Sequence, residues 1–358
     1  MRATRREFLS TVAASPLLIG MQDKAGTRAP VVGEGAFRYE VLHDWGVLPK
    51  HIRWGNTHGV AEDSQGQIYV HHTVHATSDA PDAVVVFDRD GRFVRSWGAE
   101  FRGVAHGMEI RREGTDEFLY FTANSTAPGA ANPAPAQATV VKATLRGEVV
   151  WRIQGPPDIE AYRAPAPAPP GRPPRYNPTN VAIAPNGDVY VADGYGFYFI
   201  NQYNSRGEYI RTFGGRGSEA GQMLEPHGLF VDTRQSTPVL VVADRRNNRL
   251  QRFTLDGRHL DFIPGFRLPC HFHERNGMVV IPDLHGRVTL LDARNRIVAH
   301  LGDSNAPTWN NPLRSQPRDS FIPGQFICPH GACFDHEDNI MVVEWVEVGR
   351  VTKLRKVS

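Results

Sequence analysis

The feature that most constrains this fold is a module that recurs six times from residue 57 to the end of the chain. Each module begins with a short turn, often His-Gly, followed by an apolar strand, a polar turn and a second strand that often ends in an acid. The six turns are centred on His58, His106, Asn180, His227, His271 and His330. Most turns lie about 44 to 59 residues apart, the length of one four-stranded propeller blade.

This period predicts an all-β fold, a six-bladed β-propeller of NHL-like repeats that spans residues 36–358. The second interval is longer because residues 156–178 are rich in proline, which cannot pair in a sheet. We expect a surface excursion there and a smaller one at residues 304–325. Residues 37–45 form an apolar-polar strand, which we expect to close the ring as the outer strand of the last blade.

Composition agrees with this fold and excludes some partners. The 34 glycines and 27 prolines suit many short strands joined by turns. The 40 basic and 38 acidic residues nearly balance, which argues against a nucleic-acid partner. Apolar runs are too short for a membrane span in the mature protein. Three cysteines are too few for a disulfide framework, and both a Cys270–Cys328 bridge and unpaired thiols remain open.

Residues 1–35 are expected to be a twin-arginine signal peptide and linker. The stretch Thr4-Arg5-Arg6-Glu7-Phe8-Leu9 resembles the twin-arginine export signal, and a modest apolar run follows to Gly20. That run is too short and too weakly apolar for an anchor. The resemblance implies a periplasmic or extracellular protein that is exported after folding, often already loaded with a metal or cofactor.

Three of the turns point to a metal site. In a propeller, the loops that lead to the innermost strands gather around the axis on one face. His106, His227 and His330 belong to modules two, four and six, which lie about 120° apart in a six-fold ring. Three imidazoles so placed can bind Zn²⁺ and leave a fourth position open. A glycine after each histidine permits tight backbone packing near the axis.

One His-Gly turn alone is weak support, because such a histidine often makes only a structural hydrogen bond. The set from alternate blades is more specific than any single turn, since a metal site requires three donors to converge. His58 and His271 hold the same module position in modules one and five, and Asn180 holds it in module three. The roles of these residues, and of His71 and His72, stay open from the sequence.

Ala105-His106-Gly107, Pro226-His227-Gly228 and Pro329-His330-Gly331 resemble the zinc-binding turns of peptidyl-α-hydroxyglycine α-amidating lyase (peptidylamidoglycolate lyase), a six-bladed propeller of the NHL-repeat group. Two further segments are similar to this family. Ala192-Asp193-Gly194-Tyr195 resembles the segment with its catalytic tyrosine, and residues 243–251 resemble the segment with an active-site arginine. The likeness covers roughly residues 55–355.

The resemblance implies a zinc lyase that cleaves a carbinolamide into an amide and glyoxylate. His106, His227 and His330 would hold the zinc, which polarises the oxygens of the substrate. Tyr195 would act as the base and Arg245 would neutralise the anionic substrate. The expected substrate is therefore a small or peptide-derived molecule with a hydroxyl group.

The chain departs from the family at several positions. His71-His72-Thr73 stands where the family has another active-site arginine, so one anion contact is missing or replaced by imidazole. Gly331 replaces a calcium-binding acid, which argues against the family's structural calcium. Gly196 replaces a disulfide cysteine after Tyr195. The pocket is expected to be richer in imidazole than the family's, through His58, His71, His72, His271 and His273.

An alternative to the zinc lyase stays open from the sequence. A non-catalytic NHL propeller could bind a ligand, peptide or cell-wall component on the same face. Its histidines would be widely spaced around a water-filled channel, whereas a zinc site requires donor nitrogens about 3 to 4 Å apart.

The role of the acids that end several second strands is also open. Each could orient a ligand imidazole or, as we favour, cap a turn. These acids are Asp193, Asp244, Asp283 and Glu344.

Overall fold

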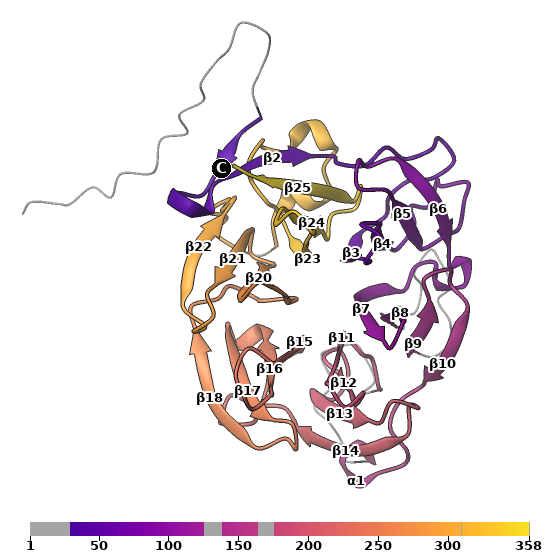
Figure 1. The fold of residues 1–358 in the computed structure, drawn as a ribbon, viewed down its shortest axis with the longest axis vertical. Coiled ribbons are helices and arrows are strands. Elements are labelled where there is room, and N and C mark those ends of the chain that lie inside the picture. Colours follow the sequence, from indigo (N-terminus) through magenta and orange to yellow (C-terminus); the bar gives the residue numbers. More distant parts are fainter. Residues whose placement is uncertain (1–28, 125–137, 164–174, 309, 358) are drawn as a thin grey trace, which may run out of the picture.

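A computed structural model describes residues 29–124, 138–163, 175–308 and 310–357, and shows a closed ring of six blades (Figure 1). Five blades are antiparallel sheets of four strands, and the sixth has five strands. The prediction of an all-β, six-bladed propeller is confirmed. The twin-arginine motif lies outside the described residues.

Blades one to three follow the predicted modules, with the first strand of each nearest the axis (Figure 1). Blade one contains β3 (Thr57–Glu62), β4 (Ile68–His72), β5 (Val84–Phe87) and β6 (Phe93–Trp97). Blade two contains β7 (Ala105–Glu113), β8 (Asp116–Ala123), β9 (Thr139–Thr144) and β10 (Val149–Ile153). Blade three contains β11 (Asn180–Ile183), β12 (Val189–Ala192), β13 (Phe199–Tyr203) and β14 (Tyr209–Gly214).

Blades four to six repeat this order. Blade four contains β15 (Pro226–Asp232), β16 (Val239–Asp244), β17 (Arg249–Thr254) and β18 (His259–Pro264). Blade five contains β19 (His273–Arg275), β20 (Met278–Asp283), β21 (Arg287–Leu291) and β22 (Ile297–Leu301). Blade six contains β23 (Pro329–Phe334), β24 (Ile340–Glu344), β25 (Arg350–Lys356), β2 (Tyr39–His43) and β1 (Val31–Val32).

The two ends of the described chain meet in blade six and close the ring. Strand β2 pairs antiparallel with β25, from Tyr39 opposite Lys356 to His43 opposite Thr352. The expectation that residues 37–45 complete the last blade is therefore confirmed. Strand β1 pairs with β2 and adds a fifth strand, so part of the segment expected to be linker belongs to the sheet. This pairing covers β25, which would otherwise be an open edge.

The hydrophobic core is divided into layers between neighbouring blades. Tyr69 and Phe121 pack between blades one and two, and Trp54 and Met341 pack between blades six and one. Similar clusters fill the other four interfaces. Each large side chain buried in this way contributes about 1.5–3 kcal/mol. Because apolar packing is supplied between the blades, the axis is left for polar side chains.

Helical structure in the described residues is limited to short segments. They are α1 (Glu160–Arg163), η1 (Gly35–Phe37), η2 (Ala99–Phe101), η3 (Arg245–Asn247), η4 (Pro312–Ser315) and η5 (Arg318–Ser320). The insertion at 304–325 contains η4 and η5, whereas the expected excursion at 156–178 is described only in its flanks. Within the described chain, no helix has the length and apolarity that a membrane crossing requires. Cys270 and Cys333 are free and buried, so the Cys270–Cys328 bridge that the sequence left open does not form; Cys328 is also buried.

Candidate metal centre

The three predicted histidine ligands lie at the start of inner strands of alternate blades. His106 is on β7, His227 on β15 and His330 on β23. At each of these turns the pairing with the second strand shifts register, between Ala105 and Met108 in blade two and at the same place in blades four and six. A bulge of this kind changes the direction in which a side chain points, and here it directs each imidazole toward the axis.

The glycine after each histidine is required by close approach to the next blade. A Cβ atom on Gly107 would lie 2.7 Å from the carbonyl oxygen of Thr179. On Gly228 it would lie 2.7 Å from the carbonyl oxygen of Cys270, and on Gly331 it would lie 2.5 Å from that of His58. Real Cβ atoms do not approach backbone oxygen so closely, so the expectation of tight backbone packing is confirmed.

The same three carbonyl groups fix the orientation of the imidazoles. The Nδ1 atoms of His106, His227 and His330 lie 2.6, 2.7 and 3.0 Å from these oxygens. A carbonyl oxygen can only accept a hydrogen bond, so each Nδ1 carries the proton. Each Nε2 therefore keeps its lone pair, as in metal-binding histidines whose other nitrogen donates to the backbone.

The three imidazole rings form a compact triangle at the axis. The ring centroids are 4.7 Å apart for His106 and His330, and 4.8 Å apart for the other two pairs. The three side chains are buried, at 2%, 0% and 3% exposed for His106, His227 and His330. Within the described structure the buried Nε2 of His330 has no hydrogen-bond partner. A buried polar atom usually has one, so a bound cation would satisfy this nitrogen.

Burial also sets the protonation state of these rings. It lowers the pKa of His227 to about 4 and the pKa of His106 and His330 well below the ordinary value. The neighbouring imidazoles lower the pKa of His106 and His330 further, because each disfavours positive charge on the other. The rings are therefore neutral near pH 7, which is the form that binds a metal ion.

The structure brings Tyr195 and Arg245 to the same place. The Tyr195 hydroxyl lies 3.1 Å from Nε2 of His106 and 3.2 Å from Nε2 of His227. Nη2 of Arg245 donates to this hydroxyl at 3.2 Å, and the guanidinium lies 5.3 Å from the tyrosine ring centroid. All five predicted site residues thus form one cluster, with the phenol between two of the imidazoles.

Glu225 holds Arg245 in position and was missed from the sequence. Its carboxylate pairs with Arg245 and with the more exposed Arg246. Arg245 is buried at 6% exposed, and its Nη1 lies 3.8 Å from the Cys270 sulfur. An acid directly before Pro226 and His227 was the available signal. Two arginines against one carboxylate leave a net positive charge beside the phenol.

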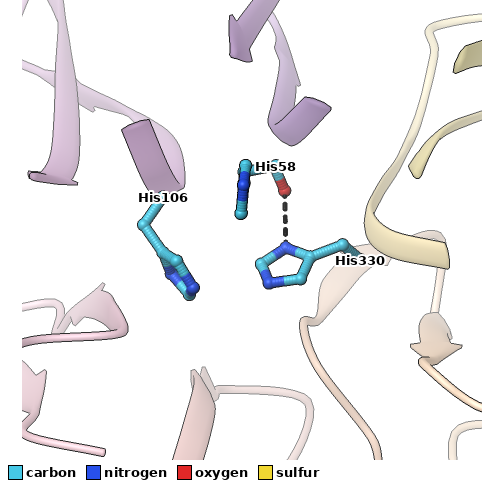
Figure 2. A group of neighbouring side chains, drawn as sticks. All are labelled: His58, His106 and His330. Atoms are coloured by element: carbon cyan, nitrogen blue, oxygen red, sulfur yellow. Dashed lines mark hydrogen bonds between the residues drawn. The ribbon is translucent and has the colours of Figure 1, made fainter. Parts of the chain in front are cut away.

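Two sets of three potential ligands have donor atoms within 4.8 Å of one another. One set is His58, His106 and His330 (Figure 2), and the other is His227, Cys270 and His330. Neither set contains all three predicted histidines: His106 is in the first, His227 is in the second and His330 is in both. Sequence reasoning did not assign His58 or Cys270 to the centre. His58 did share the module position, but so did His271.

The acids that end the second strands hold the loops that precede the inner strands. Asp193 accepts a hydrogen bond from the backbone N–H of Asn177, and Asp244 accepts one from Leu224. Asp283 and Glu344 bind N–H groups at the corresponding loops of blades five and six. This pattern supports the favoured interpretation that these acids cap turns.

His72 takes the place of such an acid in blade one. It is paired with Thr57, as Asp244 is paired with Pro226 and Glu344 with Pro329. Its Nδ1 accepts from the N–H of Gly55 at 3.3 Å and from that of Val74 at 3.2 Å. His72 therefore supports the loop before His58, and the expectation that it enriches the pocket in imidazole is not supported.

Other extra histidines also point to the backbone or into the blades. Nδ1 of His271 lies 3.1 Å from the carbonyl oxygen of Ala332, and Nδ1 of His273 accepts from the N–H of Phe334 at 3.1 Å. His71 packs against Phe121, with ring centroids 5.1 Å apart. Of the additional histidines, His58 is the one in a ligand set.

Arg314 is a second cation near the centre and lies on η4 of the insertion at 304–325. Its guanidinium stacks 3.5 Å from the Trp345 ring centroid and donates to Asn56 Oδ1 at 3.3 Å. After burial and the neighbouring imidazoles, its charge is among the causes that hold the pKa of His58 well below the ordinary value. No sequence motif marked it, because the insertion has no counterpart in the other modules.

Sequence comparison finds short local similarities to amidating enzymes. No protein-family model matches the chain. The chain is 34% identical over 110 residues, 25% of its length, to peptidyl-glycine alpha-amidating monooxygenase of Mus musculus. It is 33% identical over 79 residues, 22% of its length, to a probable peptidyl-alpha-hydroxyglycine alpha-amidating lyase of Caenorhabditis elegans. The matches span 11% of the mouse protein and 22% of the nematode protein.

Structural comparison agrees on the fold. A streptogramin B lyase structure matches with a TM-score of 0.55 at 14% identity, covering 90% of this chain and 99% of that one. A virginiamycin B lyase from Staphylococcus aureus matches with a TM-score of 0.54 at 13% identity, covering 89% of this chain and 100% of that one. At such low identity these matches establish the propeller fold alone.

Proposed function

We propose that this protein is an exported, zinc-dependent lyase that acts on a small hydroxylated, carbinolamide-like substrate. The observation that carries the proposal is the convergence of three imidazoles at the axis, with the Tyr195 hydroxyl between two of them and Arg245 beside it. The local similarity to amidating lyases supports the substrate class. Compact, buried histidines favour a metal centre over the alternative of a wide binding channel.

The donor set fits zinc. His106, His227 and His330 each offer a neutral Nε2, and imidazole is a preferred ligand of this ion. Zinc bound here would act as a Lewis acid that polarises the hydroxyl and carboxylate oxygens of a substrate. The carbonyl groups of the next blades hold the imidazole rings in place whether or not the ion is bound.

Tyr195 is placed to take the proton of the substrate hydroxyl. Its oxygen is within hydrogen-bond reach of two ligand nitrogens, so a substrate oxygen at the centre would be close to it. The Tyr195 oxygen passes the proton of the substrate hydroxyl to the amide nitrogen, while the C–O bond becomes a carbonyl and the C–N bond breaks. The products are an amide and an aldehyde.

Arg245 has two functions in this proposal. It donates to the Tyr195 oxygen and so positions the base. Together with Arg246 it leaves a net positive charge that would attract a substrate carboxylate. A carbinolamide that bears a carboxylate would release glyoxylate as its aldehyde product.

The test is cleavage of N-benzoyl-α-hydroxyglycine by purified, zinc-loaded protein, followed as benzamide and glyoxylate. We expect stoichiometric release of both products, loss of activity on chelation and recovery when zinc is restored. His271→Asn is the matched control, because this histidine has the same module position but binds the backbone of Ala332. Absence of bound metal, or full activity in His227→Ala, would refute the proposal.

Export is inferred from the residues around Arg5 and Arg6. In a bacterial host with a twin-arginine export system, we expect the wild-type chain in the periplasm. With both Arg5→Lys and Arg6→Lys, we expect it to stay in the cytoplasm. Equal export of both forms would contradict this part of the proposal.

A further inference from the structure

His58 lies between two of the predicted zinc ligands. It is on β3 of blade one, and its ring centroid is 5.0 Å from that of His106 and 4.6 Å from that of His330. Figure 2 shows the three rings facing a common space, and the carbonyl oxygen of His58 binding Nδ1 of His330. The backbone of His58 thus orients one ligand while its side chain faces the same centre.

Unsatisfied nitrogens occur on two of these three rings. Within the described chain, neither Nδ1 of His58 nor Nε2 of His330 has a hydrogen-bond partner, and both atoms are buried. Two buried nitrogen atoms without hydrogen-bond partners at one place destabilise the folded protein unless a third group binds them. A cation that accepts both lone pairs would satisfy both atoms together.

The distances allow this. One donor atom from each of His58, His106 and His330 lies within 4.8 Å of the others. Zn–N bonds of about 2.0–2.1 Å place the donors of a tetrahedral site about 3.4 Å apart. Small side-chain rotations that move each donor atom by roughly 1 Å would bring the donors to the spacing set by the Zn–N bonds.

Residues in the equivalent module position behave differently. In blade five, His271 directs Nδ1 to the carbonyl oxygen of Ala332. In blade three, Asn180 uses its side-chain oxygen to accept the N–H of Val181. Both side chains are engaged with the backbone, whereas Nδ1 of His58 is not.

We propose that His58 is a fourth imidazole ligand, so that the cation is held by blades one, two, four and six. This inference rests on the proposed three-histidine site and extends it. Four neutral imidazoles suit zinc and also Fe²⁺, Ni²⁺ or Cu²⁺. The side of the centre next to Tyr195, whose hydroxyl lies near His106 and His227, would stay available to substrate oxygens.

The test compares His58→Asn with His271→Asn, a substitution at the same module position that leaves the proposed ligands unchanged. Asparagine occurs at this position in blade three, so the fold already accepts it. Zinc affinity is measured by competition with a chelator, and the visible spectrum of the Co²⁺-loaded protein reports coordination. Loss of an outer partner of a ligand costs about 10–100-fold in affinity. We expect His58→Asn to weaken zinc binding by at least this factor and to change the Co²⁺ spectrum. We expect His271→Asn to leave both the zinc affinity and the spectrum unchanged.

A direct ligand count on the wild-type protein avoids dependence on a variant that could fold poorly. X-ray absorption of the zinc-loaded wild type should fit four imidazoles. A fit with three, or wild-type affinity and spectrum in folded His58→Asn while His227→Ala loses zinc, would overturn this inference and leave the three-histidine site intact. If the wild-type protein binds no zinc, the proposed function and this inference fail together.

Discussion

The even-numbered and odd-numbered blades of this propeller contribute to its centre in different ways. Blades two, four and six each present one histidine, held by a bulge, a following glycine and the carbonyl group of the next blade. Blades one, three and five place a different group between these rings. These groups are the imidazole of His58, the phenol of Tyr195 and the thiol of Cys270.

The difference separates two tasks. The even blades repeat one local structure, and the ring symmetry makes their imidazoles converge. Blade one has the same bulge and following glycine, but Nδ1 of His58 has no hydrogen-bond partner in the described structure. The groups that the odd blades contribute differ in charge, reach and acidity. We infer that the even blades supply the three-histidine set, and that the odd blades add the proposed fourth imidazole and the groups that act on a substrate.

The largest effect is expected when an even-blade ligand is removed. His227→Ala deletes one of three converging Nε2 donors, and we expect stoichiometric zinc binding and lyase activity to be lost. Metal analysis after gel filtration measures this. His259→Ala, on the outer strand β18 of the same blade, is the control and should keep one zinc per chain. Full zinc content in His227→Ala would break the distinction between the blades.

The next largest effect is expected at Tyr195. Tyr195→Phe removes the proposed base but no metal ligand, so we expect kcat to fall by about 10²–10⁴-fold. Zinc affinity should stay within a few-fold of wild type. Steady-state kinetics and chelator competition measure the two quantities separately. A parallel loss of zinc would mean that the phenol belongs to the metal-binding set.

Acid should destabilise the apo protein through buried histidines outside the centre. Burial lowers the pKa of His72 and His273 to about 3 and that of His43 to about 4. In the unfolded chain these groups take up protons below about pH 6.5, whereas the folded protein does not until these lower values. The free energy of unfolding should therefore fall between pH 6.5 and 4, by about 1.4 kcal/mol per pH unit for each group. Urea unfolding at pH 8, 6 and 5 checks this; equal or greater stability at pH 5 would contradict it.

A smaller effect is expected when the support of one even-blade ligand is disturbed. In Gly228→Ala the new Cβ would meet the carbonyl oxygen that holds Nδ1 of His227. We expect a loss of about 1–3 kcal/mol in the free energy of unfolding and about 10-fold weaker zinc binding. Thermal unfolding and chelator competition measure both effects. Unchanged zinc affinity would show that the carbonyl does not orient the imidazole.

The smallest effect is expected at Cys270. Burial raises the pKa of this thiol to about 11, so it is protonated at neutral pH and poorly suited to bind a metal. Although its sulfur is close enough to belong to a ligand set, we do not expect it to be a ligand. Cys270→Ser should keep zinc affinity within about three-fold, as measured by chelator competition. A loss of ten-fold or more would place the thiol among the ligands.

The repeat predicted the fold because every module supplies the strands of one blade in the same order. The convergence of His106, His227 and His330 followed from that period. The sequence could not separate His58 from His271, because both occupy the same module position. Whether such a histidine binds the backbone depends on which carbonyl group lies nearby in space, and Nδ1 of His271 lies beside the carbonyl oxygen of Ala332.

Other features were hidden because they depend on pairing between strands or on insertions. His72 replaces an acid as the loop anchor of blade one, which only the register opposite Thr57 reveals. Arg314, whose charge acts on His58, comes from an insertion with no counterpart in the other blades. The role of Glu225 depends on its ion pair with Arg245, which the sequence alone does not reveal.

A crystal structure of zinc-loaded protein, with anomalous data at the zinc edge, tests the central claim most directly. We expect one strong anomalous peak at the propeller axis, about 2.0–2.1 Å from Nε2 of each of His106, His227 and His330. A peak elsewhere, or contact through the Nδ1 atoms of these three histidines, would contradict the claim that alternate blades build one cation site.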